Sequence, residues 1–173
     1  MNAESKKPET MAGLVEYLFS IGLATPDTIR PCGPEEVDEI RRVQGVPLPA
    51  QYEDFLLTMG RRGGDLLRGT DFFYPGVIKY FDEVREFIDE TGISHLIRPN
   101  SVLVGMHQGA ELYWLEQGDP SGPLYWYQEG AEAPREVWPT LLDGLVWNAQ
   151  NQVRIREKHM VFNKETREWI ERD

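Results

Sequence analysis

Cysteine and long apolar runs are scarce in this 173-residue chain. Cys32 is the single cysteine, so an intramolecular disulfide and a zinc site built from several cysteines are both excluded. No apolar run approaches the roughly 18 residues that a membrane-spanning helix needs. The first thirty residues also lack the apolar core and cleavage site of a signal peptide. We therefore expect a cytoplasmic protein with no membrane segment. Cys32, between Pro31 and Gly33, reads as a bystander loop cysteine, and a reactive thiol is the alternative.

Basic residues are outnumbered, with 18 Lys and Arg against 29 Asp and Glu and a net charge of −11. The excess is local, because residues 31–136 hold nineteen acids and nine bases whereas residues 137–173 hold six of each. Proteins that bind nucleic acids need clustered Lys and Arg to contact phosphates. The charge pattern therefore argues against a nucleic acid as a direct partner.

Recognisable catalytic motifs are also missing. The three histidines stand apart in sequence, without metal-binding spacing, at His95, His107 and His159. Ser94-His95 has no evident acid partner, and the glycines at 60, 63 and 64 lack the lysine of a phosphate loop. The sequence predicts no catalytic residue, no metal and no cofactor. An uncharacterised hydrolase or deaminase, based on His95, His107 and the many acids, stays open as a distant alternative.

The most distinctive stretch is 34–64, which predicts two short helices joined by a proline corner. Pro34 suits the first position of a helix that Gly45 ends. Pro49 begins the second helix, and Gly60 ends it. Its apolar residues follow the spacing of a buried face, namely Tyr52, Phe55, Leu56 and Met59. The segment Val46-Pro47-Leu48-Pro49 is too restricted to continue either helix, and 61–64 predicts a turn.

The remaining patterns predict a single α+β domain. Helical stripes cover roughly 11–19, 80–91 and 140–149, and strands are expected at roughly 102–106, 111–116 and 123–128. We expect an antiparallel or mixed sheet of about 4–6 strands with helices packed around it. Residues 1–10 read as a polar lead-in and residues 11–159 as the domain. Residues 160–173 read as a hairpin or tail that extends the sheet.

These motifs together resemble the SUKH superfamily, in particular its Smi/Knr branch. The resemblance covers roughly residues 30–150 and rests on the order of several short patterns. They are Leu48-Pro49 with Tyr52, Phe55-Leu56-Leu57, the turn Gly60 to Gly64, Val102 to Gly105 with the Gly109 turn, Leu112 to Leu115, Pro123 to Tyr127, and the helix near Pro139. Arg61-Arg62-Gly63-Gly64 departs from the Asn-Gly-Gly turn that the resemblance leads us to expect.

The resemblance implies a non-catalytic protein-binding domain. Bacterial members of the family are immunity proteins that neutralise toxins, and fungal members regulate cell-wall assembly. We therefore expect an immunity protein that binds a cognate toxin domain, possibly a nuclease, as a monomer or weak dimer. A regulatory scaffold of the cell-wall type is the alternative.

Two surfaces are candidates for partner binding. The first is the helix at 80–91, on which residues 82, 86 and 89 or 90 share a solvent-facing side. Its five acids accompany a single base, Arg85; they are Asp82, Glu83, Glu86, Asp89 and Glu90. Such a row of carboxylates meets the Lys and Arg with which a nuclease holds phosphate, although it also suits a plain solvated helix.

The second candidate is the aromatic face of the strands, represented by Tyr113, Tyr125 and Tyr127 with Glu111 and Glu116 as an acidic rim. Alternation places Tyr113 and Leu115 on one face of their strand and Leu112 and Trp114 on the other. A sheet covered on both faces explains the same pattern. Trp138 and Trp147 are expected in the core.

Overall fold

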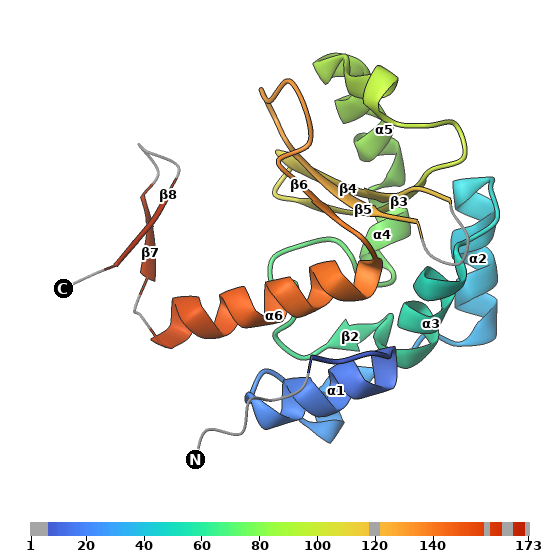
Figure 1. The fold of residues 1–173 in the computed structure, drawn as a ribbon. Helices are drawn as coiled ribbons and strands as arrows, with labels where there is room; N and C mark the ends of the chain where they lie inside the picture. Colours follow the sequence, from blue (N-terminus) through green and yellow to red (C-terminus); the bar gives the residue numbers. More distant parts are fainter. Residues whose placement is uncertain (1–6, 118–121, 158–159, 164–167, 172–173) are drawn as a thin grey trace.

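Six helices surround a four-stranded antiparallel sheet in the computed structural model, which describes residues 7–117, 122–157, 160–163 and 168–171 (Figure 1). The helices are α1 (Met11–Ser20), α2 (Pro34–Gln44), α3 (Ala50–Met59), α4 (Gly76–Lys79), α5 (Phe81–Thr91) and α6 (Leu141–Glu157). The strands are β1 (Ile29–Arg30), β2 (Arg62–Gly63), β3 (Val102–His107), β4 (Glu111–Leu115), β5 (Leu124–Gln128), β6 (Glu136–Trp138), β7 (Met160–Asn163) and β8 (Glu168–Glu171). This arrangement confirms the predicted α+β class. No helix of the described residues has the length and apolarity to cross a membrane.

The two helices of residues 34–59 begin and end where their prolines and glycines predict. Gly45 ends α2 in the left-handed conformation, with φ of 69°, and donates its N–H to the carbonyl of Arg41. Pro49 precedes α3, whose buried residues are Tyr52, Phe55, Leu56 and Met59. Arg62 and Gly63 differ from the prediction, because they pair with β1 as a small two-stranded sheet and are not only a turn.

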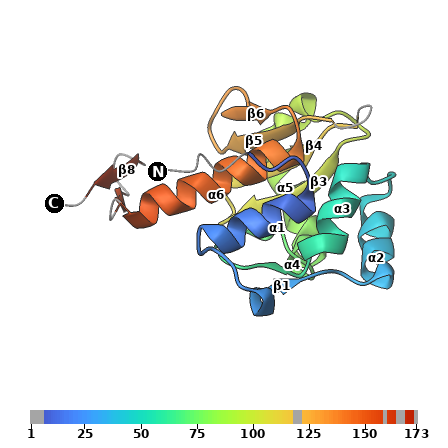
Figure 2. The same cartoon turned by 60° about the horizontal axis from the view of Figure 1, so that its bottom comes forward.

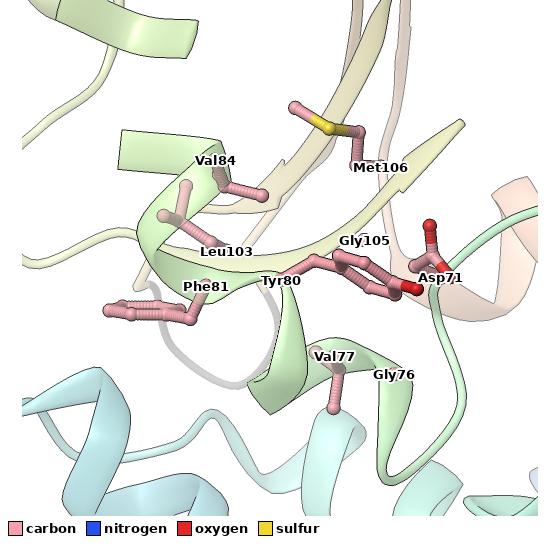
Figure 3. Close-up of a pocket in the computed structure, with 9 residues that line it drawn as sticks. All are labelled: Asp71, Gly76, Val77, Tyr80, Phe81, Val84, Leu103, Gly105 and Met106. Atoms are coloured by element: carbon pink, nitrogen blue, oxygen red, sulfur yellow. The ribbon is translucent and has the colours of Figure 1, made fainter. Parts of the chain in front are cut away.

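The main sheet has the order β3-β4-β5-β6, so each strand pairs with its neighbour in sequence. A bulge between Leu103 and Gly105 shifts the register of β3. Gly105 is required there, because a Cβ atom would lie 2.1 Å from the ring of Phe72. Figure 3 shows a pocket on another side of Gly105, in which the side chain of Tyr80 extends past Gly105 towards Asp71. This pocket lies between β3 and the helices α4 and α5, and its volume is about 10 Å³, the room of a single water. We interpret it as a small packing defect and not as a ligand site.

Each face of the sheet carries its own apolar cluster. One face packs with α1, α3 and α6 and includes Leu115, Leu124 and Trp138. The other face packs beneath α5 and includes Leu112, Trp114 and Tyr127. The alternation predicted for β4 is therefore confirmed. Both faces of the sheet are covered.

The C-terminal hairpin corrects one expectation. β7 and β8 pair with each other and form a separate two-stranded sheet, so they do not extend the main sheet. Figures 1 and 2 show why, since α6 carries the chain away from the body and the hairpin lies beyond its far end. The hairpin itself was predicted.

Candidate functional site

The five acids of α5 lie together on the outer surface of the molecule. The burial pattern of the helix fixes this arrangement, because Phe81, Val84 and Phe87 face the sheet and the positions between them face solvent. Gly92 ends the helix with φ of 69°. The solvent exposure predicted for positions 82, 86 and 89 or 90 is confirmed, and it extends to all five acids: Asp82, Glu83, Glu86, Asp89 and Glu90. We call this set the acidic face.

The carboxylates of the acidic face make no ion pair with any other described residue. The acids of α2 behave differently. Glu36 bonds to Arg61, Asp38 to Arg41, and Glu39 accepts a hydrogen bond from the hydroxyl of Tyr74 at 2.9 Å. The charges of α2 are thus largely used within the fold. Those of the acidic face remain available to a partner.

Two further acids extend this surface, and the sequence reasoning missed them. Glu129 and Glu132 are exposed in the loop between β5 and β6. Ala131, between them, packs on the apolar cluster beneath α5, and Figure 1 shows this loop close to α5. The one signal in the sequence was their contribution to the acidic excess of residues 31–136. Nothing in the sequence placed them beside α5.

The aromatic face predicted for the strands is not exposed as a single surface. Tyr127 is only 2% exposed and packs edge-on against Phe87, with ring centroids 6.3 Å apart. Tyr125 lies on the same face of the sheet, stacked on Trp114 at 5.1 Å, and is half-buried. Tyr113 lies on the opposite face, where it stacks with Trp126 at 6.3 Å. The three tyrosines therefore do not form one contact surface, because α5 and the α6 side cover both faces.

Glu116, predicted as part of an acidic rim, makes its contacts within the fold. Glu116 is 7% exposed, and its Oε2 lies 3.4 Å from Nη1 of Arg98. Burial, together with the nearby Glu116 carboxylate, raises the pKa of Tyr125. These contacts hold the end of β4 against the segment before β3. We read Glu116 as a structural residue.

Glu111 has a similar internal role at the other end of β4. Its Oε2 accepts hydrogen bonds from Nε1 of Trp126 at 3.0 Å and from the hydroxyl of Tyr113 at 3.2 Å. Burial, and then the charge of Glu111, raises the pKa of the Tyr113 hydroxyl. Glu111 thus fixes two neighbouring rings. It is partly buried and lies at the margin of any contact surface.

Residues with reactive side chains do not converge. The described residues hold no group of three His, Cys, Asp or Glu suited to a metal ion. The ring of His95 contacts the carbonyl of Gly92 at 3.0 Å on the exterior, whereas His107 lies beside Gly69 at the end of β3. His159 falls outside the described residues. Cys32 is buried, and burial raises its thiol pKa to about 11.

One exposed aromatic residue was predicted in the core. Trp147 lies on α6 and is 38% exposed. One side of its indole packs against Trp138, with ring centroids 5.3 Å apart. Trp138 itself is buried, as expected.

Comparison with known families assigns most of the chain to one family model. The family model described as the SMI1 / KNR4 family (SUKH-1) matches residues 31–146, which run from the start of α2 into α6. The chain belongs to the SMI1/KNR4 (SUKH-1) family. The acidic face and the Glu129–Glu132 loop lie within the SUKH-1 match, whereas α1 and the C-terminal hairpin lie outside it. No curated protein matches the chain.

Proposed function

We propose that this SUKH-1 protein is an immunity protein, which binds a cognate toxin domain and blocks it without turnover. The acidic face of α5 is its principal contact surface in this proposal. The observation that carries the proposal is the contrast between α5 and α2. The exposed acids of α5 have no ion-pair partner among the described residues, whereas two of the four acids of α2 are ion-paired and a third, Glu39, accepts a hydrogen bond from Tyr74.

The chemistry of the partner follows from the charge of this surface. A rigid row of carboxylates attracts a patch of Lys and Arg and accelerates the encounter of two proteins. A nuclease toxin presents such a patch where it binds the phosphates of its substrate. The acidic face then acts as a substitute for phosphate and occupies the nuclease site.

A non-catalytic role fits the interior of the molecule. Its polar side chains near the sheet mostly fix structure, as Glu111 and Glu116 do. The two described histidines that motivated a hydrolase lie in different surroundings, one on the exterior after α5 and one beside Gly69. The cell-wall scaffold alternative has no particular residue in its favour.

Co-expression with a toxin domain taken from a neighbouring reading frame tests the proposal. We expect the chain to protect cells. An acidic-face variant, in which Asp82, Glu83, Glu86, Asp89 and Glu90 become Asn or Gln, should lose most of this protection. The matched control removes the same charge from five exposed acids elsewhere, namely Glu16, Asp27, Glu35, Asp54 and Asp65. Full protection by the acidic-face variant would contradict the proposed surface, and no protection by the native chain would contradict the proposed function.

A further inference from the structure

The outer side of α6 carries a stripe of exposed and partly exposed residues at helical spacing. They are Asp143, Trp147, Gln150 and Arg154, which we call the α6 stripe. Two hollows adjoin Trp147. One, of about 370 Å³, lies between α6 and the chain at Lys7, Pro8 and Tyr17. The other, of about 150 Å³, runs along the stripe to Arg154.

Trp147 is held as a rigid projection beside these hollows. Its ring packs against Trp138 and lies 6.4 Å from the ring of Trp126, measured between centroids. An exposed tryptophan fixed in this way loses little conformational freedom when it is buried by a partner. Tryptophan is also strongly enriched among the residues that dominate interface energies. The stripe thus combines a projection and adjacent hollows on one surface.

The α6 stripe is complementary to itself when it is reversed. Asp143 precedes Trp147 by four residues, and Arg154 follows Gln150 by four. An antiparallel second helix centred between Trp147 and Gln150 therefore brings Arg154 of one copy to Asp143 of the other, and Trp147 to Gln150. Every contact occurs twice, as two-fold symmetry demands.

Arg154 and Asp143 are both able to form an ion pair with a second copy. Arg154 contacts the side-chain oxygen of Asn151 and no carboxylate among the described residues. Asp143 bonds to Lys7 and to the hydroxyl of Thr140, but its side chain remains 20% exposed. An arginine from outside can therefore join the existing Lys7–Asp143 pair.

The charge distribution of the whole chain favours this surface over others for self-association. Two copies of a chain with a net charge of −11 repel each other. The repulsion is smallest where the local charge is balanced, and residues 137–173 hold equal numbers of acids and bases. The acidic face lies on the opposite side of the sheet from α6 and stays exposed (Figure 1).

We propose that the α6 stripe is the interface of a two-fold homodimer, with α6 of a second copy packed antiparallel upon it. The arrangement also gives the C-terminal hairpin a neighbour. Glu157 of one copy comes opposite residue 140 of the other, so the β7–β8 sheet begins near the start of α6 of the partner molecule. A two-stranded hairpin is at best marginally stable alone in water. Most of the stripe lies beyond residue 146, where the family match ends.

Sedimentation equilibrium of the full-length chain from about 1 to about 200 µM tests the dimer, since this range brackets a micromolar dissociation constant. We expect a species of about 40 kDa, twice the 19.9 kDa of one chain. Arg154→Glu should weaken the dimer ~10-fold or more, because it places two acids together at each end of the interface. Arg42→Glu, at an exposed position of α2, makes the same charge change and should leave the dimer intact.

A second variant guards against a folding defect in Arg154→Glu, which far-UV circular dichroism would reveal. Gln150→Glu, at an exposed position, sets a carboxylate against the ring of Trp147 from the other copy and should also weaken the dimer. A native chain that sediments at 19.9 kDa throughout would overturn the proposal. So would equal behaviour of a folded stripe variant and Arg42→Glu, because the α6 stripe would then have no specific role.

Discussion

Arg61 and Glu36 join the glycine turn to the beginning of α2. Nε of Arg61 donates to Oε2 of Glu36 at 2.9 Å, and the same oxygen accepts the backbone N–H of Gly33 at 2.9 Å. Arg61 also lies over the ring of Tyr74, 5.2 Å from its centroid. Arg61, which directly precedes the Arg62-Gly63-Gly64 segment where Asn-Gly-Gly was expected, therefore has a structural role in this chain.

Glu36→Gln should lower the thermal midpoint at pH 7 by a few degrees, because it removes the charge that both donors bind. The hydrogen bond from Arg61, and the weaker one from Gly33, hold the pKa of Glu36 below its usual 4.5 despite partial burial. A lowered folded pKa means that the stabilisation is present above pH 4.5 and is lost as the pH falls through the folded pKa. The midpoints of the native protein and the Glu36→Gln variant should therefore converge in acid.

Glu35→Gln is the matched control for this prediction. Glu35 also lies in the first turn of α2, where a negative charge favours the helix dipole, but it is exposed and has no bond to Arg61. Its effect should be smaller at pH 7. Equal midpoints for the two variants at pH 7 would show that the Arg61–Gly33 contacts contribute nothing beyond the dipole.

Gly105→Ala should destabilise the fold by about 3 kcal/mol, the upper range for overpacking a core. The new methyl group meets the ring of Phe72, which is fully buried and cannot move into solvent. Urea unfolding measures the loss. Gly76→Ala is the control, because its nearest neighbour, Oδ1 of Asp71, is at an ordinary 3.4 Å. A Gly105→Ala protein as stable as Gly76→Ala would refute the close approach at the bulge.

Cys32 should resist thiol reagents at pH 8 in the folded protein and react at once when the protein is unfolded. Burial, and then the charge of Glu36, raises the pKa of its thiol from 9.0 to about 11. Its contribution to stability is therefore complete below pH 9 and is lost as the pH rises towards 11. Cys32→Ala should flatten the pH dependence of unfolding in this range. Rapid labelling of the native protein would contradict its burial.

Local patterns in the sequence predicted most of the longer elements of the fold because each had a local cause, whereas the short elements β1, β2 and α4 were not predicted. Gly45 and Gly92 ended their helices in the left-handed conformation, and Pro49 marked the start of α3. The C-terminal hairpin was also predicted, but its attachment was not. Whether two strands join a distant sheet depends on where α6 ends in space, and no local pattern encodes that position.

The candidate site was predictable only where it lay on one helix. The acidic face follows from the spacing of a single amphipathic helix. The surroundings of the three tyrosines at 113, 125 and 127 could be predicted only from the strand register. That register sets Tyr113 opposite Trp126 and Tyr125 opposite Trp114. The exposure of Trp147 depended on which side of α6 meets α1 and the sheet. These are contacts between distant segments, and short patterns do not specify them.

The association rate of the protein with the toxin domain proposed as its partner tests the central claim most directly. Stopped-flow measurements at about 50 and about 300 mM salt separate electrostatic steering from short-range contacts. The native protein should associate rapidly at low salt, and its association should slow steeply as salt is added. The control variant that lacks the charges of Glu16, Asp27, Glu35, Asp54 and Asp65 should behave in the same way. The acidic-face variant should associate ~10-fold or more slowly at low salt, with a much weaker salt dependence. Equal rates and equal salt dependence for the acidic-face and control variants would contradict the account.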